Sequence, residues 1–423
     1  MPLRPALARW TFVFCVLALS TAAADDDAFT SWWNGKLATG NFLGLRDARD
    51  DHGLTLGGRW RGLYVGVVSS ENGAGGFFTQ ELSFAGRLDM AKLTRLPGLD
   101  GLVAFGSTRY REPGYWTDPN NNVDGLSLFN PSRYAGGTGW RLLEFGMEYT
   151  TPEFFGIEEL LEFKAGWLRP RTEFMDQQYS NFFVNNATAT GDSVGANIPF
   201  STSFSTWGGV VEIGPVDWQY TKLGLFMSYP QGTDSNNNGL MFQGYAPDSS
   251  RNGLWFMAET GARTELGAAK LRGEYAVGAY CYQNGAGGSE GNQTGLYLDA
   301  DQLLYVEPGE DPSSSDAEGL AVGGMAAFAP PYNNEFPIFL EGALVYQGLV
   351  PRRDRDETIL GFAWAPAQQD EGASYSMVIE AGYRFRFSGW GWVQPYAQYL
   401  LQPAGTPGTA NAAVLGVFAG IDF

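Results

Sequence analysis

Charged residues recur at every second position along several apolar stretches of this 423-residue sequence. In the segment 78–90, for example, Glu81, Arg87 and Asp89 alternate with apolar residues. Side chains two residues apart point to the same face of a β-strand, so this spacing predicts strands with one charged and one apolar face. Guanidinium and carboxylate groups can donate hydrogen bonds to hydroxyl groups and accept them, and the mixed signs favour contact with neutral, hydroxyl-rich solutes. The residues that we assign to the charged face are Arg59, Arg61, Glu81, Arg87, Asp89, Arg109, Arg111, Glu144 and Lys164.

The sequence offers no arrangement typical of a catalytic centre. Its only histidine, His52, lies in an N-terminal segment outside the predicted strands, whereas a serine hydrolase needs a histidine beside its nucleophile. Cys281 falls on an apolar face, where we expect it to pack. The acid-rich stretches 117–125 and 232–239 lack the bidentate Glu and the spacing of an EF-hand, so we expect solvated loops there. We therefore predict that the protein is not an enzyme and holds no cofactor or metal.

The first 24 residues have the features of a secretory signal peptide. Two arginines precede the apolar stretch WTFVFCVLAL, residues 10–19, and small residues follow it before Asp25. Such an apolar region is too short for a membrane-spanning helix. We expect cleavage between Ala24 and Asp25, which places the mature protein outside the cytoplasm.

The charge balance excludes a nucleic-acid partner. The chain has 27 Lys and Arg against 46 Asp and Glu; cleavage removes two arginines, so the mature charge is 25 − 46 = −21. A protein that binds nucleic acid needs a basic surface, and none is evident in the sequence. Cleavage also removes one of the two cysteines, so the mature chain cannot form an intrachain disulfide.

About sixteen segments alternate in the way that strands do. We expect strands over 54–68, 77–90, 100–111, 139–150, 160–170, 204–213, 218–229, 252–263, 268–282, 294–300, 319–329, 336–347, 357–365, 374–387, 391–401 and 413–423. Short turns and long connections tend to alternate between them, the long ones being 112–138, 171–203 and 230–251. Two connections break this rule, because 301–318 is long and PPYNNE is short.

An even number of strands, with short turns at one end and long loops at the other, is typical of a transmembrane antiparallel β-barrel of the bacterial outer membrane. A soluble all-β protein with a dry core would also show alternation. The signal peptide, the long charged strand faces and the terminal Phe423 favour the barrel. We therefore expect a signal peptide over 1–24, a segment on the periplasmic side over 25–53, and a barrel over 54–423 in the outer membrane of a Gram-negative-type bacterium.

Several segments together resemble the carbohydrate-selective porin family, OprB. LATGNFLGLRDARDDHGLTLGGRW at 37–60 is similar to the N-terminal run of the family, usually Gly-Asp-Trp-Gly-Gly-Leu-Arg. Here residues 40–46 read Gly-Asn-Phe-Leu-Gly-Leu-Arg, so the Asp-Trp pair and one Gly differ. The segments 295–309, 319–364 and 378–417 resemble the later part of the family, whereas 171–250 matches only loosely.

The resemblance implies a barrel of sixteen strands that lies in the outer-membrane lipid and has a pore through the monomer, by which sugars cross by passive diffusion. In porins of this architecture, a long loop such as 171–203 commonly folds inward and narrows the lumen. Arg171 and Glu173 at its root complete the pore-lining set. A non-selective or cation-preferring general porin, suggested by the negative charge, and a structural or adhesive barrel are the alternatives. The pattern is compatible with both a monomer and a homo-oligomer.

Overall fold

The computed structural model describes residues 26–41, 45–113, 123, 127–134, 138–175, 177–190, 197, 205–228, 238–240, 253–283, 292–314, 316–331, 334, 336–367, 374–405 and 407–423. The expected signal peptide, 1–24, lies outside these residues. Among the described residues, no helix has the length and hydropathy needed to cross a membrane.

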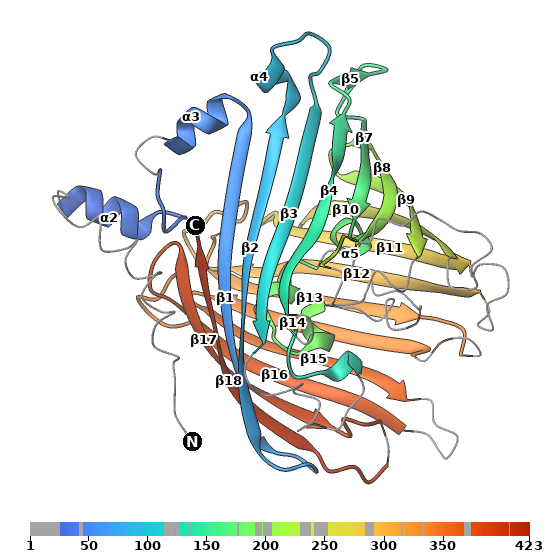
Figure 1. The fold of residues 1–423 in the computed structure, drawn as a ribbon. Coiled ribbons are helices and arrows are strands. Elements are labelled where there is room, and N and C mark those ends of the chain that lie inside the picture. Colours follow the sequence, from blue (N-terminus) through green and yellow to red (C-terminus); the bar gives the residue numbers. More distant parts are fainter. Residues whose placement is uncertain are drawn as a thin grey trace, which may run out of the picture.

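Sixteen antiparallel strands form a closed barrel, as predicted (Figure 1). Each strand pairs with its neighbours along the chain, and β1 pairs with β18 to close the sheet. The strands are β1 (Leu54–Ser69), β2 (Gly75–Asp89), β3 (Leu102–Pro113), β4 (Gly139–Thr150), β7 (Leu161–Leu168), β8 (Thr206–Val216), β9 (Gln219–Ser228), β10 (Gly253–Leu266), β11 (Leu271–Gln283), β12 (Gln293–Val306), β13 (Gly319–Phe328), β14 (Ile338–Gln347), β15 (Glu357–Ala367), β16 (Ser374–Arg386), β17 (Gly391–Leu401) and β18 (Ala412–Asp422).

Short helices and a small ribbon lie between the strands. The helices are α2 (Asp26–Asn34), α3 (Leu45–Asp51), α4 (Met90–Thr94), α5 (Pro170–Glu173) and α6 (Asn186–Thr190), with 3-10 turns η2 (Ser127–Phe129) and η3 (Gln178–Phe182). Strands β5 (Glu153–Phe154) and β6 (Ile157–Glu158) form a separate ribbon in the β4–β7 turn. This ribbon, α3, α4 and the C terminus gather at one end of the barrel (Figure 1).

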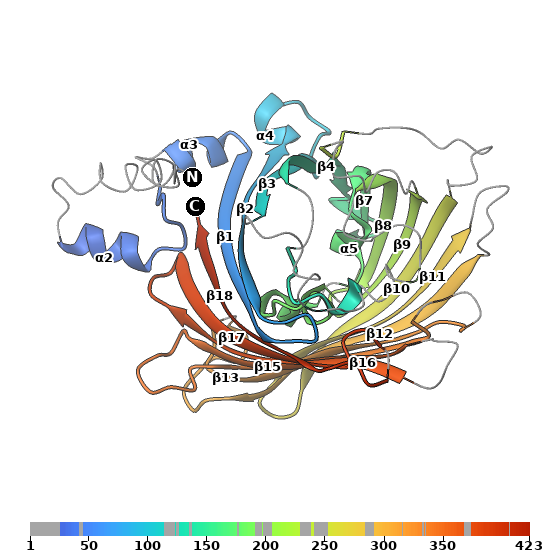
Figure 2. The same cartoon turned by 60° about the horizontal axis from the view of Figure 1, so that its bottom comes forward.

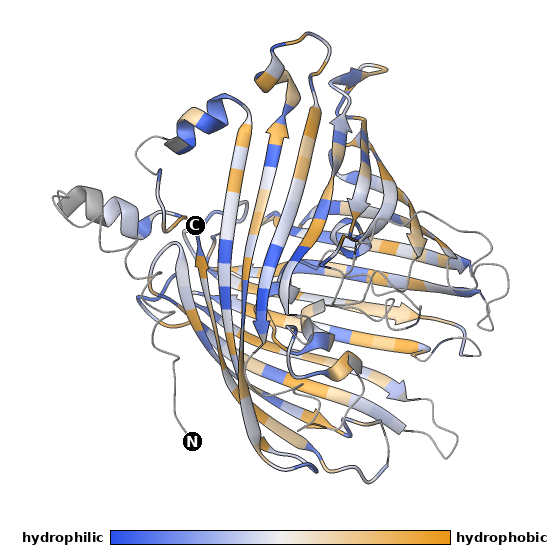
Figure 3. Cartoon of the chain, viewed as in Figure 1, coloured by the Kyte–Doolittle hydropathy of each residue, from blue (hydrophilic) through white to orange (hydrophobic). Residues whose placement is uncertain are grey.

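The two faces of the strands differ as the alternation predicts. On β12, side chains at odd positions from Gln293 to Leu303 are buried, whereas Leu296 and Leu298 are at least half exposed on the outside. Cys281 is also exposed on the outer, apolar face of β11. Orange apolar segments and blue polar segments alternate along many strands (Figure 3). An apolar outer face meets lipid without exposing polar groups to it.

Two β-bulges explain where the sequence pattern misleads. The predicted strand 294–300 is too short, because β12 continues to Val306 and leaves only 307–318 as the turn. The register shifts between Leu303 and Tyr305, so Leu304 and Tyr305 are both exposed and the alternation breaks there. A second shift, between Ser107 and Thr108 on β3, leaves Leu143 of β4 without a cross-strand partner. An extra residue of this kind reverses the facing of every residue beyond it.

The N-terminal segment packs on the rim at the end with the short turns. Ala38 N donates to the carbonyl oxygen of Asp422, and Gly389 N donates to that of Trp33. The Trp33 ring lies 5.6 Å from the ring of Trp390, in the turn between β16 and β17. Aromatic rings of this kind suit the boundary between lipid and water.

Much of the lumen is filled by the chain itself. Segments between the strands, including α5, lie within the ring of strands (Figure 2). Phe174, Phe183 and Val184 from these segments are fully buried among inward-facing residues such as Trp255 and Phe339. The space left for solutes is therefore decided by where these segments bind the wall.

Candidate functional site in the barrel lumen

The third outer loop, residues 169–205, is held along the inner wall by carboxylates from three strands. A buried backbone N–H without a partner is costly, so these acids fix the loop in place. Met175 N donates to the carboxylate of Glu259 at 3.2 Å. Gln178 N donates to Asp301 at 2.9 Å, and Val184 N donates to Glu380 at 2.7 Å.

Glu380 of β16 makes the most contacts with this loop. Besides Val184 N, it accepts hydrogen bonds from Asn185 N at 2.8 Å and from the Thr188 hydroxyl at 3.2 Å. The side chain is fully buried, and Gln398 of β17 donates a further bond to it. Because it accepts hydrogen bonds from three groups of the loop, Glu380 is the main anchor of the loop.

The second outer loop, residues 114–138, lies over the third one in its described part, 127–134. Arg133 N donates to the carbonyl oxygen of Val184, and Asn186 N donates to that of Asn130. Tyr134 packs against Phe418 of β18 and lies 5.1 Å from the guanidinium carbon of Arg111. The two loops together cover the wall from β9 to β18.

The wall from β1 to β4 carries a row of arginines. Cross-strand pairing places Arg59 opposite Ser83, Ser83 opposite Arg109, and Arg109 opposite Arg141. One level further from the short turns, Arg61 lies opposite Glu81 on the neighbouring strand, and Glu81 lies opposite Arg111. Glu81 bonds both neighbouring arginines of β3, at 2.6 Å from Arg111 and 3.3 Å from Arg109. Donors and acceptors thus lie side by side on this wall.

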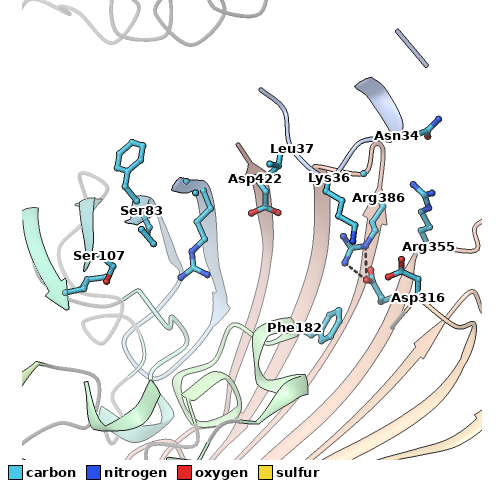
Figure 4. Close-up of a pocket in the computed structure, with 18 of the residues that line it drawn as sticks. Asn34, Lys36, Leu37, Ser83, Ser107, Phe182, Asp316, Arg355, Arg386 and Asp422 are labelled. Atoms are coloured by element: carbon cyan, nitrogen blue, oxygen red, sulfur yellow. Dashed lines mark hydrogen bonds and ion pairs between the residues drawn. The ribbon is translucent and has the colours of Figure 1, made fainter. Parts of the chain in front are cut away.

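A cavity of about 860 Å³ opens below this row, on the side of the short turns. Its lining includes Arg59, Ser83, Ser107 and Glu144 from one wall, and Phe182 of η3. Ser83 and Ser107 lie on one side of the space, Arg355, Arg386 and Asp316 on the other, and Phe182 lies between them (Figure 4). The Phe182 ring is supported by Arg384, whose guanidinium carbon lies 4.4 Å from the ring centroid.

The predicted residues at the root of the third loop form two ion pairs. Lys164 Nζ lies 2.6 Å from Glu173 Oε1, and Arg169 Nη2 lies 2.9 Å from Glu144 Oε2. Arg171 donates to the carbonyl oxygen of Ala189 across the loop. Among these side chains, Lys164, Glu173 and Arg171 therefore bind the loop itself, whereas Glu144 also lines the cavity.

Three other predicted residues make contacts of their own, and two of them, Arg87 and Asp89, lie nearer the short turns. Arg87 forms an ion pair of 2.5 Å with Glu148, half exposed to solvent. The Asp89 carboxylate accepts a hydrogen bond from Lys92 N and caps the N-terminus of α4. Arg61 pairs with Asp422 at 2.7 Å, and its guanidinium lies 5.4 Å from the Trp392 ring centroid. Only Arg59 of the predicted set is exposed and without a hydrogen bond or ion pair in the described part of the chain.

Several functional side chains were missed by the sequence analysis. Arg141 escaped notice because the bulge at Leu143 separates it from the facing of Glu144. Glu259 and Asp301 share their face with apolar residues such as Trp255 and Tyr297, so the inner face does not appear polar there. The alternation of the strands would have placed these two acids inside if we had expected an inner face that is partly apolar.

The side chains that line the cavity are mainly hydrogen-bonding and charged groups. Arg59 and Arg169 present guanidinium donors to the cavity, Glu144 presents an acceptor, and Ser83 and Ser107 present hydroxyls. Within the described residues, no group of three or more His, Cys, Asp or Glu side chains is placed to hold a metal ion. Hydrogen-bonding groups beside an aromatic ring are suited to polyhydroxylated solutes.

Comparisons with known proteins give the family from the sequence and the fold from solved structures. A family profile described as carbohydrate-selective porin, OprB family, matches residues 78–423. A high-pH structure of Pseudomonas putida OprB superimposes with a TM-score of 0.78 at 18% identity, covering 92% of this chain and 99% of that one. An anion-selective porin from Comamonas acidovorans gives 0.53 at 13% identity, covering 88% and 99%. No curated protein sequence gives a significant match.

Proposed function

Since this chain belongs to the OprB family of carbohydrate-selective porins, and is thus a channel that lets carbohydrates cross the outer membrane, we propose that its solutes bind in the lumenal cavity below the arginine row. The binding residues are Arg59, Arg169, Glu144, Ser83, Ser107 and Phe182. The observation that carries this proposal is the presence of donors, acceptors and an aromatic ring around one cavity of about 860 Å³, large enough for a sugar.

Each group has a role that its chemistry suggests. Arg59 and Arg169 donate hydrogen bonds to sugar hydroxyls, and Glu144 accepts them. The Phe182 ring offers an apolar face to the C–H side of a pyranose ring. Weak, solvated contacts of this kind hold a solute briefly and release it, which a channel requires.

Glu81 and Arg111 act behind this site as support. Their side chains are only 6% and 7% exposed, so a passing solute meets their neighbours Arg59 and Arg109 first. The fixed charge of Glu81 holds both arginines of β3 in one orientation. Positioned donors lose less entropy on binding than free side chains do.

The path to the membrane is also part of the proposal. We infer that residues 1–24 are a signal peptide removed on export, that 25–53 stay on the periplasmic side, and that 54–423 form the barrel. The packing of Ala38 and Trp33 on the rim with the short turns supports this division. Cross-linking in membranes would measure the oligomeric state.

Conductance measurements test the binding site. Glucose should reduce the ionic current through wild-type channels in planar bilayers, and Arg59→Gln and Phe182→Ala should each weaken that block. Lys92→Gln, which removes an exposed charge on α4 outside the cavity, is the matched control. Full glucose block in both cavity variants would place the binding site elsewhere. Equal conductance loss for all solutes would instead favour a general porin.

A further inference from the structure

The charges that line the cavity are unevenly neutralised. The cavity is lined by five basic and four acidic residues: Lys36, Arg59, Arg169, Arg355 and Arg386, and Glu144, Asp316, Glu357 and Asp422. The formal difference is 5 − 4 = +1, although the whole chain carries −19. Which of these charges act on a solute depends on which of them are already paired.

Three of the four acids have a basic partner within ion-pair distance. Glu144 pairs with Arg169 at 2.9 Å, and Glu357 pairs with Arg386 at 2.5 Å. Asp422 pairs at 2.7 Å with Arg61, which lies just outside the lining set. These pairs carry no net charge toward a solute; Asp316, in the β12–β13 turn, is the fourth acid of the lining.

Three of the bases have no such partner. Lys36, Arg59 and Arg355 make no hydrogen bond or ion pair with any residue that the structure describes, and all three are exposed to the cavity or its mouth. They come from separate parts of the chain: the N-terminal segment, β1 and the β14–β15 turn. Lys36 and Arg355 both lie on the cavity wall in Figure 4. Apart from the three ion pairs, the lining therefore holds three bases and one further acid, Asp316.

We propose that this cavity selects carbohydrates that carry a carboxylate, such as uronic or aldonic acids, over neutral sugars of the same size. A partly enclosed site lined by one sign of charge concentrates solutes of the opposite sign. Lys36 and Arg355 attract the carboxylate, and Arg59 passes it to the hydroxyl-binding residues deeper in the cavity. This inference rests on the proposed function, because it assigns a substrate class to the same site.

The test compares three sugars of similar size and different charge. Proteoliposomes that contain the full-length barrel are supplied with radiolabelled glucosamine, glucose or glucuronate, and their entry rates are measured at low salt. We expect glucuronate to enter about threefold to fivefold faster than glucose, and glucosamine to enter more slowly than glucose. At low salt the charges of the cavity are only weakly screened. The triple variant Lys36→Gln, Arg59→Gln, Arg355→Gln should remove the advantage of glucuronate.

The controls separate this inference from the function on which it rests. Lys92→Gln should leave all three rates unchanged, and the folded barrel of each variant is verified by its heat-dependent mobility on gels. If glucose enters and glucuronate enters no faster, the anion preference is wrong and the sugar channel stands. If neither sugar enters faster than a disaccharide, the sugar site itself is wrong. Faster entry of glucose 6-phosphate without a gain for glucuronate would overturn the assignment to carboxylates.

Discussion

Glu81 Oε2 lies 2.6 Å from Arg111 Nη2, and the two residues are direct cross-strand partners on β2 and β3. Both side chains are almost fully buried, at 6% and 7% exposure, under the second outer loop. The pair is therefore less available to a solute than the alternating sequence suggested. Its main effect is to hold the arginine row of the open wall.

Removal of Arg111 alone should destabilise the barrel. Arg111→Ala leaves the Glu81 carboxylate buried beside Arg109 only, and breaking a buried ion pair costs about 3–5 kcal/mol before water relieves it. The double variant Glu81→Gln, Arg111→Gln should cost less, because no lone charge remains. Unfolding in urea, followed in detergent micelles, measures both free energies of unfolding.

Arg87→Ala provides the matched control for this prediction. Its pair with Glu148 is half exposed on the arginine side, and exposed pairs contribute about 0–1 kcal/mol. A similar loss of stability for Arg87→Ala and Arg111→Ala would contradict the role of burial. We also expect the double variant to retain sugar block, since Arg59 still faces the cavity.

Glu380→Ala should release the third outer loop from β16. The variant removes the acceptor of two backbone amides and of the Thr188 hydroxyl, and hydrogen bonds contribute about 0.5–1.5 kcal/mol each. We expect a larger single-channel conductance and faster entry of disaccharides. Glu162→Ala removes another inward carboxylate, one with no bond to the loop among the described residues, and should leave both quantities unchanged. Unchanged conductance in Glu380→Ala would show that other contacts hold the third outer loop in place without Glu380.

The barrel could be predicted from the sequence because alternation repeats on every strand. Strand β17 was predicted at its observed bounds, 391–401, since its outward residues are apolar and a short turn precedes it. The predicted end of β12 at residue 300 was wrong because the bulge between Leu303 and Tyr305 breaks the alternation, so 301–306 resembles a loop in the sequence. The Asp301 carboxylate in this segment accepts a hydrogen bond from Gln178 N of the third outer loop.

The contents of the lumen could not be predicted in the same way. Whether Glu380 faces water or a loop backbone depends on a contact 196 residues away along the chain, with Val184. Strand parity gives the side of the wall but not what covers it. The cavity was missed for this reason: it is the space that the second and third outer loops leave uncovered beside Arg59 and Phe182.

Lipid-facing positions should tolerate charge according to their depth. Leu298 is half exposed in the middle of β12, so Leu298→Arg should cost about 2–4 kcal/mol. Phe84 lies on the outer face too, but its ring packs against the C-terminal Phe423 near the rim, so Phe84→Arg should cost about 0–1 kcal/mol. Ser83→Arg faces the lumen and should assemble normally. Assembly yield and urea unfolding measure how much each of the three variants is destabilised. Equal yields for all three would contradict the assignment of these residues to the lipid and lumen faces.

The orientation of the barrel can be tested with single cysteines. In a Cys281→Ser background, Asn72→Cys lies in the exposed β1–β2 turn and Glu310→Cys in the exposed β12–β13 turn, at opposite ends. An impermeant thiol reagent should label Asn72→Cys on intact cells, and Glu310→Cys only after the outer membrane is broken. Labelling of Glu310→Cys alone on intact cells would mean that the barrel is inverted.

Acid should weaken the β14–β15 turn through Asp356. Burial alone would raise the pKa of this carboxyl, but hydrogen bonds from Arg353 and Tyr383 and from Arg386 N lower it on balance. A lowered folded-state pKa contributes stability above the unfolded value of about 4, which is lost as the pH falls through the folded value. Wild-type barrels should therefore lose stability between neutral pH and about pH 3. Asp356→Asn should be less stable at pH 7 and should lose less on acidification, as measured by urea unfolding. An equal loss in both proteins would mean that other carboxylates cause the acid sensitivity.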